Sequence, residues 1–289
     1  MRRICSLACL LALGCTGEPI EVMTGYVDVE GARLYYEEAG QGTPVVLIHG
    51  GFLDRRMWDG QFEVFAQRYR AIRYDVRAHG LSHADSVDFA DHEDLRQLMA
   101  ALDVPSATLI GLSMGGQIAT DFALAYPEMV SALVLVGPGL SGHTAEDEEL
   151  RAYMEDLTAA FETGGFSAAI EVFARYWCDG PERGPSEVVS AVREKVLTML
   201  EGSGERWRYW DLSRQLEPPA FGRLAEIEAP TLVIVGGIDM PVIHEIADLI
   251  AQQVPDARKV VIPEVAHMVN MEMPEVFSDL VLEFLAGSN

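Results

Sequence analysis

The sequence predicts an α/β protein whose sheet is doubly wound and mostly parallel, with a helical cap inserted before the penultimate strands. Two observations carry this prediction. Short, wholly apolar runs recur along the chain, which is typical of parallel strands that are buried on both faces. Segments of helix length with amphipathic spacing separate these runs. The runs span residues 45–48, 71–74, 108–110, 133–136, 231–235 and 259–262.

The first strands differ from the later ones. Residues 25–29 and 33–37 alternate apolar with polar side chains, and Glu30-Gly31 lies between them. This pattern indicates an antiparallel hairpin ahead of the parallel part of the sheet. Helical spacing then occurs at residues 92–102, 115–126 and 275–285.

One interval contains no strand-like run. Residues 139–221 hold four helical stretches, at 145–161, 167–177, 186–200 and 205–215, with glycine and proline between them. We interpret residues 139–221 as a helical cap inserted into a core formed by 25–138 and 222–289. Three of the four tryptophans, Trp177, Trp207 and Trp210, fall in this cap. Together with Phe52 they are predicted to line a substrate pocket that suits a hydrophobic or aromatic group.

The N-terminus resembles an export signal. Residues 1–14 combine a basic start with a short apolar stretch, too short to span a bilayer, and small residues precede Cys15. This resembles a bacterial lipoprotein cleavage box, although Ala12 stands where that box usually has leucine. We expect a lipidated Cys15, a tether over 15–24, and a location in the cell envelope. If the segment is not a signal, the protein is expected in the cytoplasm.

Composition excludes some classes of partner. The chain has 289 residues with a formal net charge of -24, so it repels nucleic acid, and no nucleic-acid partner is expected. Three of its four cysteines lie within the first fifteen residues, and Cys178 alone remains in the body. A disulfide framework is therefore not expected.

The sharpest local motif is Gly111-Leu112-Ser113-Met114-Gly115, between an apolar run and a helical segment. A serine forced into a tight strand-to-helix turn needs glycine two places on either side, because side chains there would collide with neighbouring backbone. The turn exposes the hydroxyl at the positive end of the next helix. Ser113 is the predicted nucleophile.

A serine hydroxyl needs a base that is oriented by a third group. His267 follows the run at 259–262, and Asp239 ends the segment after the run at 231–235. We predict His267 as the base and Asp239 as the acid, in the chain order Ser, Asp, His. No carboxylate follows the run at 133–136, and Glu272 is expected to support the histidine loop.

The tetrahedral intermediate requires two amide donors. One is predicted to be the N–H of Met114, and the other is assigned to Gly51, in the loop after the run at 45–48. Phe52 remains an alternative to Gly51. No metal and no cofactor are expected, because the histidines and carboxylates at 83–94 lack regular ligand spacing.

These motifs together resemble the capped α/β-hydrolase family, which includes enol-lactonases, arylesterases with haloperoxidase-like side activity, C–C bond hydrolases, dehalogenases and epoxide hydrolases. Serine at 113 departs from dehalogenases and epoxide hydrolases, and Leu112 departs from C–C bond hydrolases. The resemblance implies a serine hydrolase that acts on a small-molecule carboxylic ester or lactone. The alternatives are a C–C bond hydrolase, a haloperoxidase-like arylesterase, or a non-catalytic binding protein on the same fold. The motifs that carry this resemblance are residues 49–51, 57–58, 74–82, 111–116, 236–239, His267 and 272–274.

Overall fold

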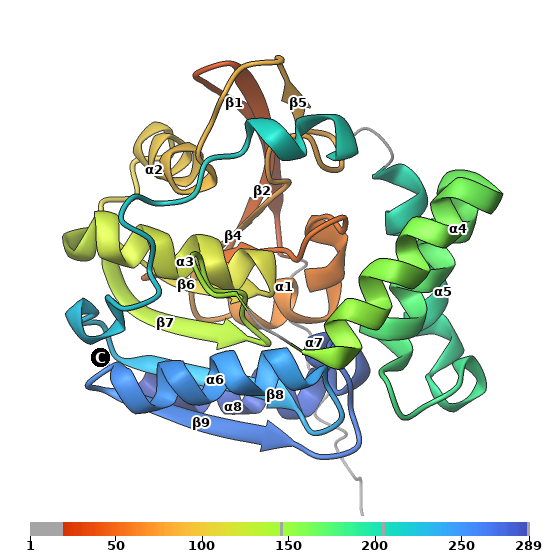
Figure 1. Ribbon diagram of the computed structural model, residues 1–289. Helices are drawn as coiled ribbons and strands as arrows, with labels where there is room; N and C mark the ends of the chain where they lie inside the picture. Colours follow the sequence, from red (N-terminus) through yellow and green to blue (C-terminus); the bar gives the residue numbers. More distant parts are fainter. Residues whose placement is uncertain (1–19, 145–146, 204–205, 288–289) are drawn as a thin grey trace, which may run out of the picture.

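A mixed β-sheet lies at the centre of the structure, a computed structural model that describes residues 20–144, 147–203 and 206–287 (Figure 1). The predicted leader and Cys15 lie outside the described residues. In the described part of the chain, the sheet has nine strands in the order β1-β2-β4-β3-β6-β7-β8-β9, with β5 paired to β2. Their bounds are β1 Val22–Val29, β2 Ala32–Ala39, β3 Pro44–Ile48, β4 Arg70–Tyr74, β5 His83–Ala84, β6 Ala107–Leu112, β7 Val130–Val136, β8 Thr231–Gly236 and β9 Ala257–Ile262.

The strand directions match the two patterns in the sequence, alternating residues for antiparallel strands and wholly apolar runs for parallel strands. β1, β2 and β4 pair antiparallel, whereas β4, β3, β6, β7, β8 and β9 pair parallel along the rest of the sheet. The predicted hairpin and the predicted parallel runs are confirmed. β1 begins at Val22, inside the predicted tether, because β2 extends to Ala39 and gives Val22 a partner in the ladder.

Helices cover both faces of the sheet. In β3, Val46 and Ile48 pack into one core, and the alternate residues Val45 and Leu47 pack into the other. One face carries α2 (Asp91–Ala101), α3 (Met114–Ala125) and α6 (Pro241–Gln253), and the other carries α1 (Asp59–Ala66) and α8 (Pro274–Gly287). Burial on both faces is the physical reason why the strand runs are wholly apolar. The doubly wound fold class is confirmed.

The segment between β7 and β8 is helical. It contains α4 (Glu148–Phe173), a π-helical turn η3 (Ala174–Asp179), η4 (Pro185–Glu187), α5 (Ser190–Gly202) and η5 (Arg206–Leu212). In Figure 1, α4 and α5 lie beyond the carboxyl ends of the parallel strands. The helices predicted at 145–161 and 167–177 merge in α4, which is kinked at Gly165 (φ 67°, ψ -158°), and the end of the second continues into η3. The helix predicted at 205–215 is a shorter 3-10 helix.

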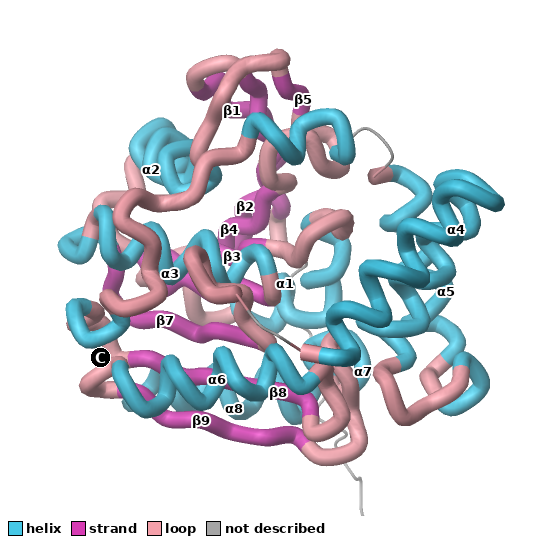
Figure 2. The backbone as a smooth tube through the Cα atoms, viewed as in Figure 1, coloured by secondary structure: helices cyan, strands magenta, loops and turns pink. Residues whose placement is uncertain are grey.

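The chain then returns to the core through an irregular segment, residues 213–223, which Figure 2 shows as loop passing over α3. A bridge between Phe89 and Ser213 holds its start, and Phe221 N–H donates to Ser141 O at 2.9 Å near its end. The remaining short elements are η1 (Arg55–Trp58), η2 (Pro127–Met129), η6 (Leu224–Glu226) and α7 (Val269–Glu272). Among the described residues, no helix has the length and hydropathy needed to cross a membrane.

Candidate active site

Ser113 occupies a tight turn between β6 and α3. Its backbone has φ 55° and ψ -114°, which an L-residue adopts only under strain, and its N–H donates to Val136 O at 2.9 Å. A Cβ on Gly111 would lie 2.1 Å from Gly115 O, and a Cβ on Gly115 would lie 2.2 Å from Ile48 O. Both glycines are therefore required for the close packing of β6, α3 and β3 that forms this turn.

Asp239 and His267 meet behind the turn, although 28 residues separate them in the chain. Asp239 follows β8, His267 follows β9, and the carboxyl ends of these neighbouring parallel strands bring the two residues together. His267 Nδ1 lies 2.8 Å from Asp239 Oδ2, and both side chains are buried. The other carboxylate oxygen, Oδ1, accepts the N–H of Met240 at 2.8 Å. The carboxylate is thus held at both oxygens.

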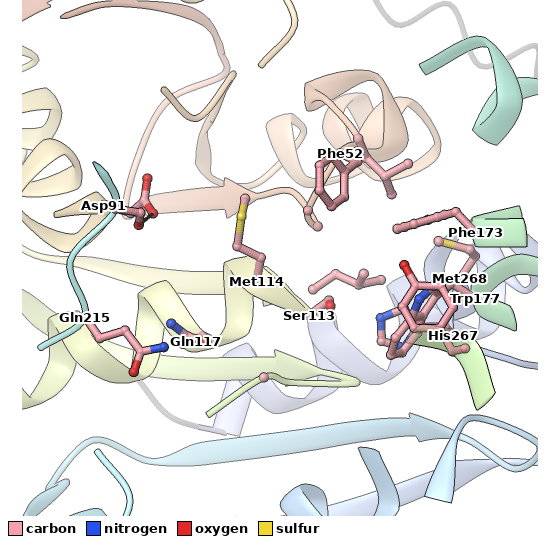
Figure 3. A pocket seen from close by; sticks show the side chains of 17 residues that line it. Phe52, Asp91, Ser113, Met114, Gln117, Phe173, Trp177, Gln215, His267 and Met268 are labelled. Carbon is pink, nitrogen blue, oxygen red and sulfur yellow. Dashed lines mark hydrogen bonds between the residues drawn. The ribbon is translucent and has the colours of Figure 1, made fainter. Parts of the chain in front are cut away.

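This arrangement determines the tautomer of His267. A carboxylate only accepts hydrogen bonds, so Nδ1 carries a proton, and the neutral form of the ring presents a lone pair at Nε2. Nε2 is buried and has no hydrogen-bond partner among the described residues. His267 and Ser113 line the same pocket (Figure 3). A hydroxyl, an imidazole and an orienting carboxylate therefore come together at one end of the sheet.

Two residues pack against this imidazole. The ring of Trp177, from the helical segment, lies 4.8 Å from the His267 ring, centroid to centroid. Gly137, just after β7, has φ 44°, and a Cβ there would lie 2.9 Å from His267 Nδ1 and 3.1 Å from Asp239 Oδ2. Sequence reasoning missed Gly137. The available signal was a glycine that directly follows the apolar run at residues 133–136.

Hydrogen bonding favours one of the two candidates for the second amide donor. The N–H of Phe52 donates to His79 Nε2 at 3.2 Å, so it already has an acceptor. Gly51 lines the pocket, and a Cβ on it would lie 3.8 Å from Cβ and Sδ of Met114. Met114 opens α3, so its amide lies at the positive end of that helix. The amides of Gly51 and Met114 therefore come from adjacent loops beside Ser113.

Two neutral histidines brace the Gly51 loop. His49 Nε2 accepts the N–H of Val76 at 2.9 Å, so its Nδ1 carries the proton and donates to Gly50 O at 2.8 Å. His79 has the same tautomer, because its Nε2 accepts from Phe52 while Nδ1 lies 2.9 Å from Arg77 O. Each ring hydrogen-bonds one backbone group in the loop after β3 and one in the loop after β4, so the two rings connect these loops. Their role is structural.

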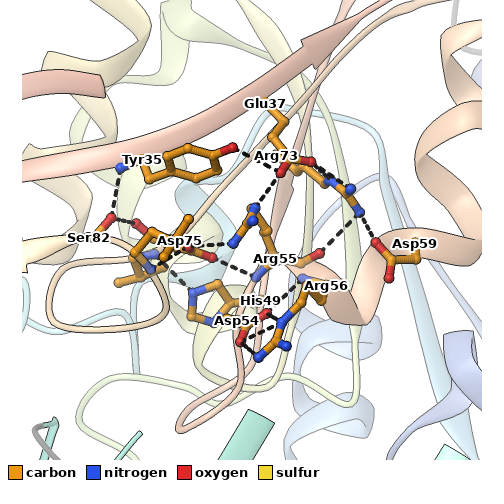
Figure 4. A network of polar contacts seen from close by, with 12 residues as sticks. Tyr35, Glu37, His49, Asp54, Arg55, Arg56, Asp59, Arg73, Asp75 and Ser82 are labelled. Atoms are coloured by element: carbon orange, nitrogen blue, oxygen red, sulfur yellow. Dashed lines mark hydrogen bonds and ion pairs between the residues drawn. The ribbon is translucent and has the colours of Figure 1, made fainter. Parts of the chain in front are cut away.

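A network of ion pairs next to the Gly51 loop adds to these contacts (Figure 4). The buried carboxylate of Asp75 accepts the N–H and Nη1 of Arg55, at 2.9 and 2.8 Å, and the N–H of Leu81 at 2.8 Å. Burial raises the pKa of Asp75, while the neighbouring Arg55 and these hydrogen bonds oppose that rise. Arg55 also donates to Glu37 Oε1 at 2.6 Å. The network ties η1 to β2 and to the loop after β4.

The pocket over Ser113 has a volume of about 360 Å³. Of the predicted pocket residues, Phe52 and Trp177 line it. Trp207 and Trp210 belong to η5, and their side chains lie outside what the structure describes. The pocket also contains residues that the sequence analysis did not predict, because packing between segments far apart in the chain brings them together. These are Leu53, Asp91, Gln117, Gly139, Tyr153, Phe173, Ser213, Gln215 and Met268.

Comparisons with known proteins agree with this geometry. A model of the alpha/beta hydrolase fold family matches residues 43–274. The chain is 30% identical over 247 residues to the (E)-2-((N-methylformamido)methylene)succinate hydrolase of Acinetobacter baylyi, covering 83% of this chain and 89% of the relative. It is 28% identical over 271 residues to the 2-hydroxy-6-oxo-6-phenylhexa-2,4-dienoate hydrolase of Burkholderia cepacia, covering 88% and 92%. A thermophilic esterase from Thermogutta terrifontis is similar in structure, with a TM-score of 0.77, 27% identity and coverage of 92% and 99%. The family match spans most of the chain, and the chain therefore belongs to the alpha/beta hydrolase fold family.

Proposed function

We propose that this protein hydrolyses a carboxylic ester or lactone through an acyl-enzyme on Ser113. One observation carries the proposal most directly. His267 holds Asp239 through Nδ1 and keeps Nε2 buried and without a hydrogen-bond partner among the described residues, in the pocket that Ser113 lines. An imidazole in this tautomer can accept the serine proton.

The mechanism follows from these positions. Ser113 Oγ attacks the carbonyl carbon while His267 Nε2 accepts its proton, and Asp239 stabilises the imidazolium that results. The N–H groups of Gly51 and Met114 bind the oxyanion of the tetrahedral intermediate. His267 then gives the proton to the leaving alcohol, and afterwards it activates the water that releases the acyl group. No metal or cofactor is needed for any of these steps.

The pocket supports an aromatic or otherwise apolar group in the substrate. Trp177 lies against His267, and its ring is in edge contact with that of Tyr153, at 5.6 Å between centroids. Phe52 and Phe173 form another edge contact at 5.9 Å. Aromatic pairs of this kind make a rigid apolar wall. The Trp177 end of this wall lies beside the imidazole that protonates the leaving group, so the alcohol part of the ester is expected there.

Labelling with a fluorophosphonate probe tests the nucleophile. The wild-type protein should be labelled, and Ser113→Ala should not. Ser213→Ala is a matched control, because Ser213 lines the same pocket but hydrogen-bonds a carboxylate and no imidazole. It should keep the label. Absence of labelling in the wild type would favour a binding protein on the same fold.

Turnover of p-nitrophenyl esters tests the reaction itself. Ser113→Ala should lower kcat by about 10⁶, and Asp239→Asn by about 10⁴. The double variant should be no slower than Ser113→Ala, because a base without its nucleophile has nothing to activate. Near-normal turnover by Ser113→Ala would refute the assignment. A silent Asp239→Asn would refute only the choice of acid. Labelling without turnover of esters or lactones would favour cleavage of a C–C bond.

A further inference from the structure

The pocket over Ser113 has two chemically different ends, and Ser113 lies between them (Figure 3). Trp177 and Phe173 mark the aromatic end beside His267. The opposite end carries Asp91, together with two amide side chains. The proposed mechanism uses the first end for the leaving alcohol and leaves the second without a role.

Three separate parts of the chain build this polar end. Asp91 is the first residue of α2. Gln117 lies on α3, one turn after Ser113, and its N–H donates to Ser113 O at 3.0 Å. Gln215 belongs to the segment that returns from η5, where its Oε1 accepts the N–H of Gly142 at 3.2 Å. A backbone hydrogen bond thus positions Gln117, and a side-chain hydrogen bond positions Gln215, at the pocket wall.

The polar end offers hydrogen-bonding groups from two neutral amides, Gln117 and Gln215, beside the carboxylate of Asp91. Gln117 is half-buried, and its side chain has no hydrogen bond to any of the described residues, so one donor pair and one acceptor oxygen face the pocket. Gln215 keeps its amide NH₂ group as a donor. Asp91 Oδ2 accepts from the hydroxyl of Ser213 at 3.3 Å. No lysine or arginine occurs among the described residues that line the pocket.

We propose that this polar end is a subsite for an uncharged hydrogen-bonding group on the acyl part of the substrate, of which a carboxamide is the best match, and that it rejects a carboxylate. A carboxamide pairs with the amide of Gln117 through both a donor and an acceptor. A carboxylate there meets no lysine or arginine among the described lining residues and lies near Asp91, in a protein whose formal net charge is -24. The assignment of this end to the acyl part rests on the proposed function, because His267 protonates the alcohol at the other end.

Three isosteric benzyl esters test the subsite. They are the benzyl esters of 5-methylhexanoic acid, of glutaramic acid and of glutaric acid as its monoester, so the acyl chain ends in isopropyl, carboxamide or carboxylate. We expect kcat/KM for the carboxamide to exceed that for the carboxylate by at least about tenfold, and that for the isopropyl ester by about three- to tenfold. Equal rates for the carboxylate and the carboxamide would overturn the proposal.

Two variants assign the effect to residues. Gln117→Leu should lower the ratio of carboxamide to isopropyl turnover to about one, and Asp91→Asn should relax the rejection of the carboxylate by about tenfold. Asp85→Asn is the control for Asp91, because it removes the same charge from an exposed side chain in the loop before α2. It should leave all three rates unchanged. Unchanged ratios in folded Gln117→Leu and Asp91→Asn would overturn the assignment.

Binding of the three matching N-benzyl amides provides a readout that does not depend on ester cleavage. Their dissociation constants, measured by calorimetry, should follow the same order, with the carboxamide bound most tightly and the carboxylate most weakly. If the esters are not cleaved but this order holds, the proposed reaction fails and the subsite stands. If the esters are cleaved and neither the rates nor the dissociation constants show the order, only the subsite fails.

Discussion

Replacing Gly137 by alanine should uncouple His267 from Asp239 without altering any residue that reacts. The new Cβ would lie 2.9 Å from Nδ1 and 3.0 Å from Cε1 of His267, and 3.1 Å from Asp239 Oδ2. It would therefore press on both partners of the 2.8 Å hydrogen bond at once. Ordinary van der Waals contact needs about 3.5 Å or more, so the pair must separate or shift by about half an ångström to one ångström.

The expected loss of rate lies between two limits. A shift of about 1 Å in a reacting group can cost about 10² in rate. Complete loss of the orienting carboxylate costs about 10⁴. We therefore expect kcat of Gly137→Ala to fall by about 10² to 10⁴, with a much smaller change in KM. Alanine at φ 44° also adds backbone strain, which costs about 1–2 kcal/mol of stability.

Initial rates on a p-nitrophenyl ester, measured together with Tm, separate the two effects. Gly222→Ala is the matched control, because Gly222 has φ 89° with nothing within 4 Å of its Cβ position. It should lose a similar amount of stability and keep its rate. Near-normal kcat in folded Gly137→Ala would refute the reasoning. An equal loss of kcat in both variants would assign the loss to backbone strain instead.

Three further predictions concern the histidine loop, a buried acid and the N-terminus. Glu272 accepts the N–H of Ala266 at 3.2 Å and pairs with Arg183 at 2.8 Å. Steady-state kinetics should therefore show that Arg183→Met lowers kcat about tenfold. Glu272→Gln keeps an acceptor for the Ala266 N–H and should lower kcat less. Burial raises the pKa of Asp121 from 3.8 to about 6, so the folded state binds this proton more tightly than the unfolded chain does. The free energy of unfolding should therefore fall by about 3 kcal/mol as pH rises from about 4 to 6. Urea unfolding of Asp121→Asn should lack this loss, and an unchanged pH profile would contradict the argument. If Cys15 is lipidated, Cys15→Ser should abolish both acyl labelling and recovery in the membrane fraction, and unchanged fractionation would remove the lipoprotein hypothesis.

Much of the fold was predictable because it depends on local patterns. Buried parallel strands need apolar side chains on both faces, so runs such as residues 45–48 are visible without tertiary information. The turn at Ser113 was predictable for a similar reason, since Gly111 and Gly115 are required by contacts that every such turn makes. The helical segment was harder to predict in detail. Gly165 lies within α4 at a kink instead of ending the helix, because neighbouring residues resume helical geometry on either side.

The candidate site likewise has residues that the sequence predicts and residues that only the structure reveals. Chain order by itself determined that Asp239 and His267 follow neighbouring late strands, because parallel strands bring their carboxyl ends to one edge of the sheet. Only the tertiary structure favours Gly51 over Phe52 as the proposed partner of Met114, because the acceptor for Phe52 N–H is His79, 27 residues away in the chain. Only the tertiary structure showed that Gly137 backs the Asp239–His267 pair.

The pocket is the clearest case of a feature that local patterns do not determine. Its aromatic end depends on how the helical segment docks over Ser113, and its polar end joins Asp91, Gln117 and Gln215 from three distant parts of the chain. No spacing or periodicity relates these positions, because each side chain faces the pocket only after its segment has packed against the others. The sequence by itself therefore determined the fold class and the order of the residues proposed to react. The shape and polarity of the space that receives a substrate were decided by packing between segments far apart in the chain.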